Sequence, residues 1–91
     1  MNKLLKDTIG LMMSDNYKDR FKAEYFQVKI RYDRLHRILI QYEAGTLPFE
    51  LKCSSQMLRD QAHFMDQYLR ILEIRAEIEG VDLSFEEADN E

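Results

Sequence analysis

The chain of 91 residues is poor in the residues that cross-link or bend small proteins. It contains one cysteine, one proline, three glycines and no tryptophan. The single cysteine, Cys53, excludes a disulfide within the chain and is typical of a reducing compartment. The three glycines are isolated, which excludes a glycine-rich phosphate loop. A domain this short buries a modest core, so without disulfides we expect it to need a metal or self-association.

Long apolar runs are also missing. No stretch approaches the ~20 apolar residues of a membrane-spanning helix, and Asp7 and Gly10 interrupt the amino-terminal segment, which argues against a secretion signal. We therefore expect a cytoplasmic protein without a membrane partner. The net charge of −4 argues against general nucleic-acid binding. Residues 16–43, however, carry seven basic and four acidic side chains, a net charge of +3 that permits a small anionic ligand.

The spacing of apolar residues predicts two long helices. Residues 16–44 have large apolar side chains at steps of three and four, which is typical of a helix packed lengthwise on another. These residues are Tyr17, Phe21, Tyr25, Val28, Tyr32, Leu35, Leu39 and Tyr42. The second helix is predicted over residues 54–79, and Gly45 and Gly80 are suited to the left-handed conformation that ends each helix. Residues 1–15 predict a short helix or arm, and residues 81–91 an acidic flexible tail.

These elements predict an all-α fold: a short amino-terminal helix plus a long antiparallel two-helix hairpin over residues 16–80, assembling into a helical-bundle oligomer. The second long helix has two neighbouring apolar stripes that together cover about 200°, more than one partner helix covers. The first stripe is Leu58, Ala62, Met65, Leu69, Leu72 and Ala76, and the second stripe is Met57, Phe64, Tyr68, Ile71 and Ile78. Phe26 and Ile30, opposite the apolar stripe of the first long helix, also predict a second partner. The amino-terminal arm can supply some of this cover but is short, so we expect a homo-oligomer.

Catalytic and metal-binding patterns are weak. No strand–turn–helix context positions a nucleophile, so we do not expect an enzyme. Asp33 and His36, and likewise Asp60 and His63, place a carboxylate and an imidazole three residues apart, as in bundle metal sites. The two further inward carboxylates of a di-metal site are missing. We interpret both pairs as surface residues and expect no metal and no cofactor.

Lysines and tyrosines share one edge of the first long helix. A tyrosine offers a stacking face and a hydroxyl, and a lysine offers charge for a phosphate, so this edge is suited to a nucleotide at an interface between protomers. Alternatively, the tyrosines pack in the apolar stripe and the lysines flank it. Arg75 lies inside the apolar arc of the second helix, where it needs Glu79 or a bound anion as a partner. The predicted ligand-binding residues are Lys18, Lys22, Tyr25, Lys29, Tyr32 and Arg75.

The stretches KDRFKAEYFQVKIRYDRLHRILIQYEAGTL and YLRILEIRAEIEGVDL resemble a group of short uncharacterised phage and prophage proteins related to a protein of a crAss-like gut phage. The resemblance spans residues 16–83 and implies a phage accessory protein acting in the cytoplasm of an infected bacterial cell. It assigns no site residues. In size and architecture the chain is also similar to phage anti-CBASS sponges, small helical hairpins that form symmetric oligomers and sequester cyclic nucleotides.

Two hypotheses for function follow. The first is a phage anti-defence protein that binds and sequesters a nucleotide-type immune signal at oligomer interfaces, without catalysis. The second is a non-enzymatic interaction module that binds a host or phage protein through its spare apolar faces or through the loop of residues 46–49, which carries Leu47, Pro48 and Phe49.

Overall fold

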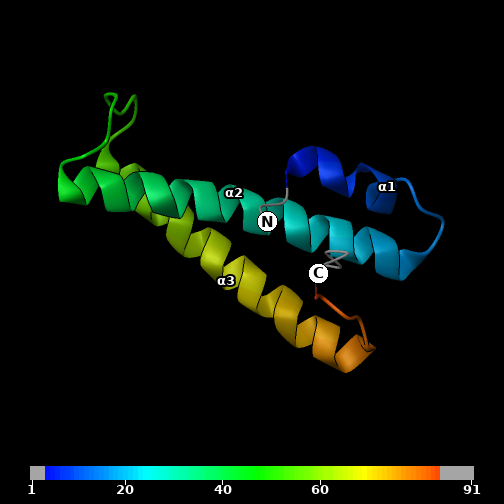
Figure 1. Cartoon of the computed structure of the whole chain (residues 1–91). Coiled ribbons are helices and arrows are strands. Elements are labelled where there is room, and N and C mark those ends of the chain that lie inside the picture. The colour runs from blue at the N-terminus through cyan, green and yellow to red at the C-terminus, as the bar shows by residue number, and fades with distance from the viewer. Residues whose placement is uncertain (1–3, 85–91) are drawn as a thin grey trace.

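The computed structural model describes residues 4–84, and this part of the chain is helical without any strand. It contains the 3-10 helix η1 (Leu5–Thr8) and the helices α1 (Ile9–Met12), α2 (Tyr17–Ala44) and α3 (Ser55–Glu79). Figure 1 shows α2 and α3 as an antiparallel hairpin, with the connecting loop standing out at one end and α1 lying beside α2 toward the other. The predicted all-α fold, with a short amino-terminal helix and a long hairpin, is confirmed.

Short-range chemistry sets the ends of both long helices. Asn16 and Ser54 are the N-caps, and their side-chain oxygens accept hydrogen bonds of 2.8 and 3.1 Å from backbone N–H groups in the first turn. Such caps satisfy donors that have no partner inside the helix. Gly45 and Gly80 follow the helices with φ of +78° and +72°. They adopt the left-handed conformation that the sequence predicts, which glycine reaches without steric cost.

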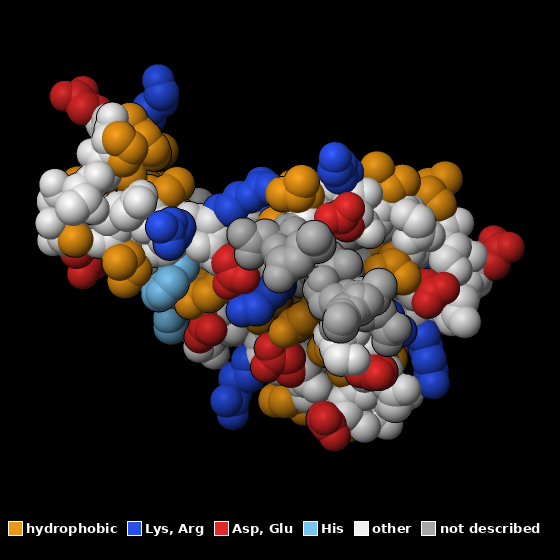
Figure 2. Space-filling model, viewed as in Figure 1, with side chains coloured by type: hydrophobic (Ala, Val, Ile, Leu, Met, Phe, Trp, Pro, Cys, Tyr) orange, Lys and Arg blue, Asp and Glu red, His pale blue; other side chains and the backbone are white. Residues whose placement is uncertain are grey.

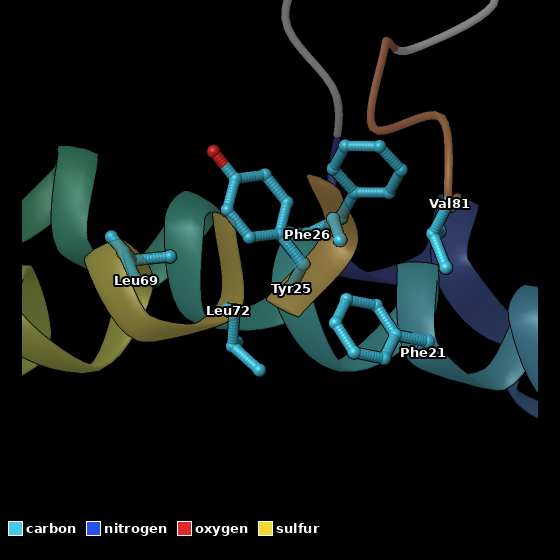
Figure 3. Packing of buried hydrophobic residues seen from close by; sticks show 7 residues of the cluster. Phe21, Tyr25, Phe26, Leu69, Leu72 and Val81 are labelled. Carbon is cyan, nitrogen blue, oxygen red and sulfur yellow. The ribbon is translucent and has the colours of Figure 1, made fainter. Parts of the chain in front are cut away.

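The main core lies in the half of the hairpin away from the connecting loop. Its buried members come from α2, from the first stripe of α3 and from the segment after α3. They are Phe21, Tyr25, Phe26, Leu69, Leu72, Ala76 and Val81. Figure 3 shows the α2 rings gathered beside Leu69 and Leu72, with Val81 approaching from the returning chain. Val81 belongs to the predicted tail but is buried; the rest of that tail beyond Ser84 lies outside the described residues.

The amino-terminal arm, η1 plus α1, covers the outer face of α2. Phe26 and Ile30 are only 5% and 9% exposed, and Leu11 of the arm packs against the core cluster that contains Phe26. Gln27 Nε2 donates a hydrogen bond of 2.9 Å to Oγ1 of the fully buried Thr8. The expectation that Phe26 and Ile30 need a partner from another chain is therefore wrong, because the chain's own arm covers them.

The second stripe of α3 stays exposed. Its five side chains and the neighbouring Ile74 are between 40% and 79% exposed. The first stripe is rotated by about 120° from the second and supplies the buried contacts with α2, whereas the second stripe reaches α2 only through the hydroxyl of Tyr68 at its edge. Across residues 4–84, no helix combines the length and apolarity that crossing a membrane requires.

Candidate ligand-binding surface

The hairpin has two long edges where side chains of α2 and α3 meet. Along one edge, Tyr17 and Glu24 lie seven residues apart and so project from the same face of α2. Glu24 accepts a hydrogen bond from Tyr68, and Tyr17 contacts Arg75 and Glu79. We call this the Arg75 edge.

The opposite edge carries the lysines that the sequence singled out, and we call it the lysine edge. Lys18 and Tyr25, also seven residues apart, project from a neighbouring face of α2. Lys18 Nζ donates to the carbonyl oxygen of Gly80 at 3.2 Å, and the Tyr25 hydroxyl donates to Glu73 at 2.7 Å. The predicted ligand-binding residues therefore do not form one cluster within a chain, because Arg75 lies on one edge and the lysines lie on the other.

The lysines have partners within the chain, but these contacts are weak. Lys29 Nζ lies 3.1 Å from Asp33, and both side chains are about half exposed. Lys22 lies close enough to Asp82 to contribute to the lowered pKa of that carboxyl, after the larger effect of hydrogen bonds from Ser84. Exposed ion pairs are worth at most about 1 kcal/mol. A bound phosphate can therefore compete for these lysines at little cost.

Tyr25 is a core residue more than a surface ligand. Its ring is buried in the main core, and its hydroxyl is held by Glu73. Burial raises the pKa of the Tyr25 hydroxyl, and the hydrogen bond to Glu73 raises it further. The side chain is therefore held in its neutral, hydrogen-bonded form at physiological pH.

Tyr32 and His36 form an aromatic pair in the middle of the lysine edge. Their rings are stacked, with centroids 5.7 Å apart and planes inclined by 18°. Lys29 Nζ lies 5.9 Å from the centroid of the Tyr32 ring. Two stacked rings beside a lysine present a flat apolar surface and a positive charge together, the combination that suits a base and its phosphate.

A basic hollow adjoins this pair. It is a shallow, open surface region, and its described lining is Asp33, Arg34, His36, Arg37 and Ile40, all from α2. Arg34 and Arg37 are exposed, and within residues 4–84 neither makes an ion pair of 4 Å or less. Guanidinium groups bind phosphates and carboxylates through paired hydrogen bonds.

The arginines of the hollow were missed by sequence reasoning, which followed only residues adjoining the tyrosines. The positive charge of residues 16–43 was a signal for these arginines. The sequence did not show that they lie next to the stacked pair and outside the arm, because this depends on where the arm stops covering α2. The arm is held near Gln27 by Thr8 and Met12, and Arg34 and Arg37 lie about two to three turns further along the helix.

Arg75 has the intramolecular partner that the sequence allowed. Its Nε lies 3.2 Å from Glu79, and its guanidinium donates to the Tyr17 hydroxyl at 3.0 Å. The Tyr17 hydroxyl donates in turn to Glu79 at 2.8 Å, and the guanidinium lies 4.9 Å from the Phe21 ring centroid. The hydrogen bond from Tyr17, and after it the one from Arg75, lowers the pKa of Glu79. Arg75 thus links the last turns of α3 to the first turns of α2, at the end of the hairpin away from the connecting loop.

Metal chemistry has no support in the described residues. Between residues 4 and 84, no three side chains among His, Cys, Asp and Glu converge where they could hold a metal ion. Asp33 contacts Lys29, and Asp60 accepts a hydrogen bond from Gln56. Cys53 is an exposed free thiol in the connecting loop.

Residues 4–84 thus form a small all-α hairpin with an aromatic and cationic edge and an exposed apolar stripe on α3. The family model described as Sequestin matches residues 15–78. The chain therefore belongs to the Sequestin family, whose name denotes sequestration, a binding role. This agrees with the sponge-like interpretation of the sequence. No curated protein or solved structure shows a significant match to the chain.

Proposed function

We propose that this protein is a phage anti-defence protein that binds a nucleotide-type immune signal and holds it without chemical conversion. The phage context comes from the sequence resemblance, and the sequestering role agrees with the family name. The observation that carries the ligand class is the stacked pair Tyr32–His36 between Lys29 and the basic hollow.

In this proposal the stacked pair receives the base, while Arg34, Arg37 and Lys29 receive phosphate. Lys18 and Lys22 lie further along the same edge, where they extend the positive field for a longer or doubly phosphorylated ligand. Arg75 lies on the other edge, so it reaches a ligand only if another copy brings its own Arg75 to the site. Tyr25 supports the edge from the core through Glu73.

A ligand panel tests the proposal. Mono-, di- and tri-nucleotide signals, cyclic forms and ADP-ribose derivatives are each added to the protein, and the melting temperature is measured. A ligand at about 100 times its Kd stabilises the folded state by about 2.7 kcal/mol, which raises Tm on the order of 10 °C. The ligand should be recovered intact after denaturation. No shift with any ligand would contradict the proposal, and recovery of a converted product would indicate an enzyme.

Charge reversal in the hollow locates the site. Arg37→Glu removes a donor to the phosphate and adds repulsion, so we expect binding at least about tenfold weaker. Lys52→Glu, which makes the same change of charge in the connecting loop, should leave the affinity unchanged. Equal effects of the two substitutions would mean that only the overall field of the protein matters.

The apolar end of the hairpin supports a second candidate function, the binding of a protein partner. A cavity of about 270 Å³ lies under the connecting loop, with an almost wholly apolar lining that includes Leu35, Ile38, Phe49, Leu51 and Leu58. Figure 2 shows apolar side chains gathered over this projecting loop. Phe49 is about half exposed at the rim, which suits it to receive an apolar side chain of another protein.

An affinity pull-down from host cells tests this second candidate. Phe49→Asp should abolish capture of a specific host or phage protein, and Met13→Asp, at an exposed site on the arm, should leave it intact. Capture that survives Phe49→Asp would contradict a role for the loop.

A further inference from the structure

The side chains of the second stripe of α3 have the spacing that is typical of a helix packed along another helix. With Gln61 and Arg75 included, its members follow one another at steps of four and three along the whole of α3. The positions are Met57, Gln61, Phe64, Tyr68, Ile71, Arg75 and Ile78. This alternation keeps one line of side chains facing a partner helix over several turns. Within residues 4–84, no helix covers this line.

We propose that a second copy of this chain docks on the second stripe, with the two α3 helices antiparallel and related by a two-fold axis near Tyr68. The proposal goes beyond ligand binding and does not depend on it. Because one patch contacts its own copy, the interface closes on itself and yields a dimer instead of an open filament.

The area supports a second copy as the occupant. The six exposed side chains, the second stripe and Ile74, average somewhat more than half exposed. With roughly 200 Å² for each side chain when free, they present about 700 Å² per copy. Two copies then remove about 1,400 Å² from water, which lies within the range of specific, stable interfaces.

Charge favours the antiparallel direction. A parallel pair would place each Arg75 opposite the same residue of the other copy, so like charges would meet. In the antiparallel pair, Arg75 lies opposite the first turns of the other α3, close to Asp60 and Phe64. An acidic side chain and an aromatic ring both suit a guanidinium. Antiparallel helix dipoles also oppose each other favourably.

Two isoleucines with the same exposure provide a matched test. Ile71 lies in the second stripe and Ile40 on the outer face of α2, and each is 55% exposed. In sedimentation and light-scattering measurements, the wild type and Ile40→Glu should be dimers. Ile71→Glu should raise the dimer dissociation constant at least about a hundredfold, because it buries an unpaired carboxylate. A monomeric wild type, or an Ile71→Glu protein that stays dimeric, would overturn the proposal.

Single-cysteine variants in a Cys53→Ser background test the direction, and they remain informative if Ile71→Glu fails to fold. A short bifunctional maleimide should cross-link Tyr68→Cys to itself. It should not cross-link Ile78→Cys to itself, since these positions lie about 30 Å apart in the antiparallel pair. A mixture of Met57→Cys and Ile78→Cys should cross-link. Self-linkage of Ile78→Cys, or no linkage of Tyr68→Cys, would overturn the antiparallel arrangement. Ligand is absent throughout, so the outcome is independent of the proposed function.

Discussion

Leu72 is the most completely buried large apolar side chain of the described core, whereas Ile40 has the same number of carbons and is about half exposed. Leu72→Ala leaves a cavity among the α2 rings, so we expect the free energy of unfolding to fall by about 2–5 kcal/mol. Ile40→Ala creates no cavity and should change it by less than about 0.5 kcal/mol. Urea denaturation of the two variants measures both changes. Similar losses in the two would mean that α3 does not pack on α2 through its first stripe.

Glu79 makes the stability of the contacts between the end of α3 and the start of α2 depend on pH. Hydrogen bonds from Tyr17 and then Arg75 lower its pKa from the ordinary value of 4.5. A carboxyl whose pKa is lower in the folded state stabilises the fold above its unfolded pKa, and this contribution is lost as pH falls through the lowered value. The melting temperature should therefore decline below about pH 4.5. Glu79→Gln should make that decline shallower, whereas an unchanged acid slope would show that the contacts do not persist in solution.

At the scale of elements, the backbone conformation of a glycine decides whether its substitution by alanine raises or lowers the stability of the fold. Gly80 ends α3 with φ of +72°, while Gly10 lies within α1, where an added Cβ meets no atom within 4 Å. Gly80→Ala should cost about 1–2 kcal/mol because a side chain disfavours the left-handed conformation. Gly10→Ala should stabilise by about 0.5–1 kcal/mol, since alanine loses less entropy in a helix. Thermal denaturation distinguishes the opposite signs, and a loss in both variants would contradict this difference between the sites.

The arm shows how a short element can replace a partner chain. Thr8 is fully buried, donates to the carbonyl of Leu5 at 2.7 Å and accepts from Gln27. These hydrogen bonds fix the arm over a face of α2 that would otherwise be apolar and exposed. Within residues 4–84, the second stripe of α3 lacks such a cover and stays exposed.

At the scale of the whole molecule, folding and dimerisation should be linked. If the second stripe is buried only between copies, mass action makes the melting temperature rise with protein concentration. We expect this rise for the wild type over about a hundredfold range of concentration. It should be lost in Ile71→Glu and retained in Ile40→Glu. A melting temperature independent of concentration in the wild type would contradict the linkage.

The sequence by itself determined the elements of this protein. Helix spacing, the caps Asn16 and Ser54, and the glycines Gly45 and Gly80 act through contacts within a few residues, so the pattern of residues is sufficient to predict both long helices. The two stripes of α3 follow from the same periodicity. The periodicity does not determine which of the two stripes packs against α2, because rotation of a helix about its own axis changes no local interaction.

Tertiary structure alone decided which side chains share a surface. It placed the arm over Phe26 and Ile30, and it separated Arg75 from the lysines by turning them toward opposite edges of the hairpin. It also stacked Tyr32 on His36 beside the basic hollow. These arrangements depend on how three elements pack around a common core, and that packing is set by contacts between residues far apart in the chain. The candidate site therefore depends on tertiary packing as well as on the local pattern of residues.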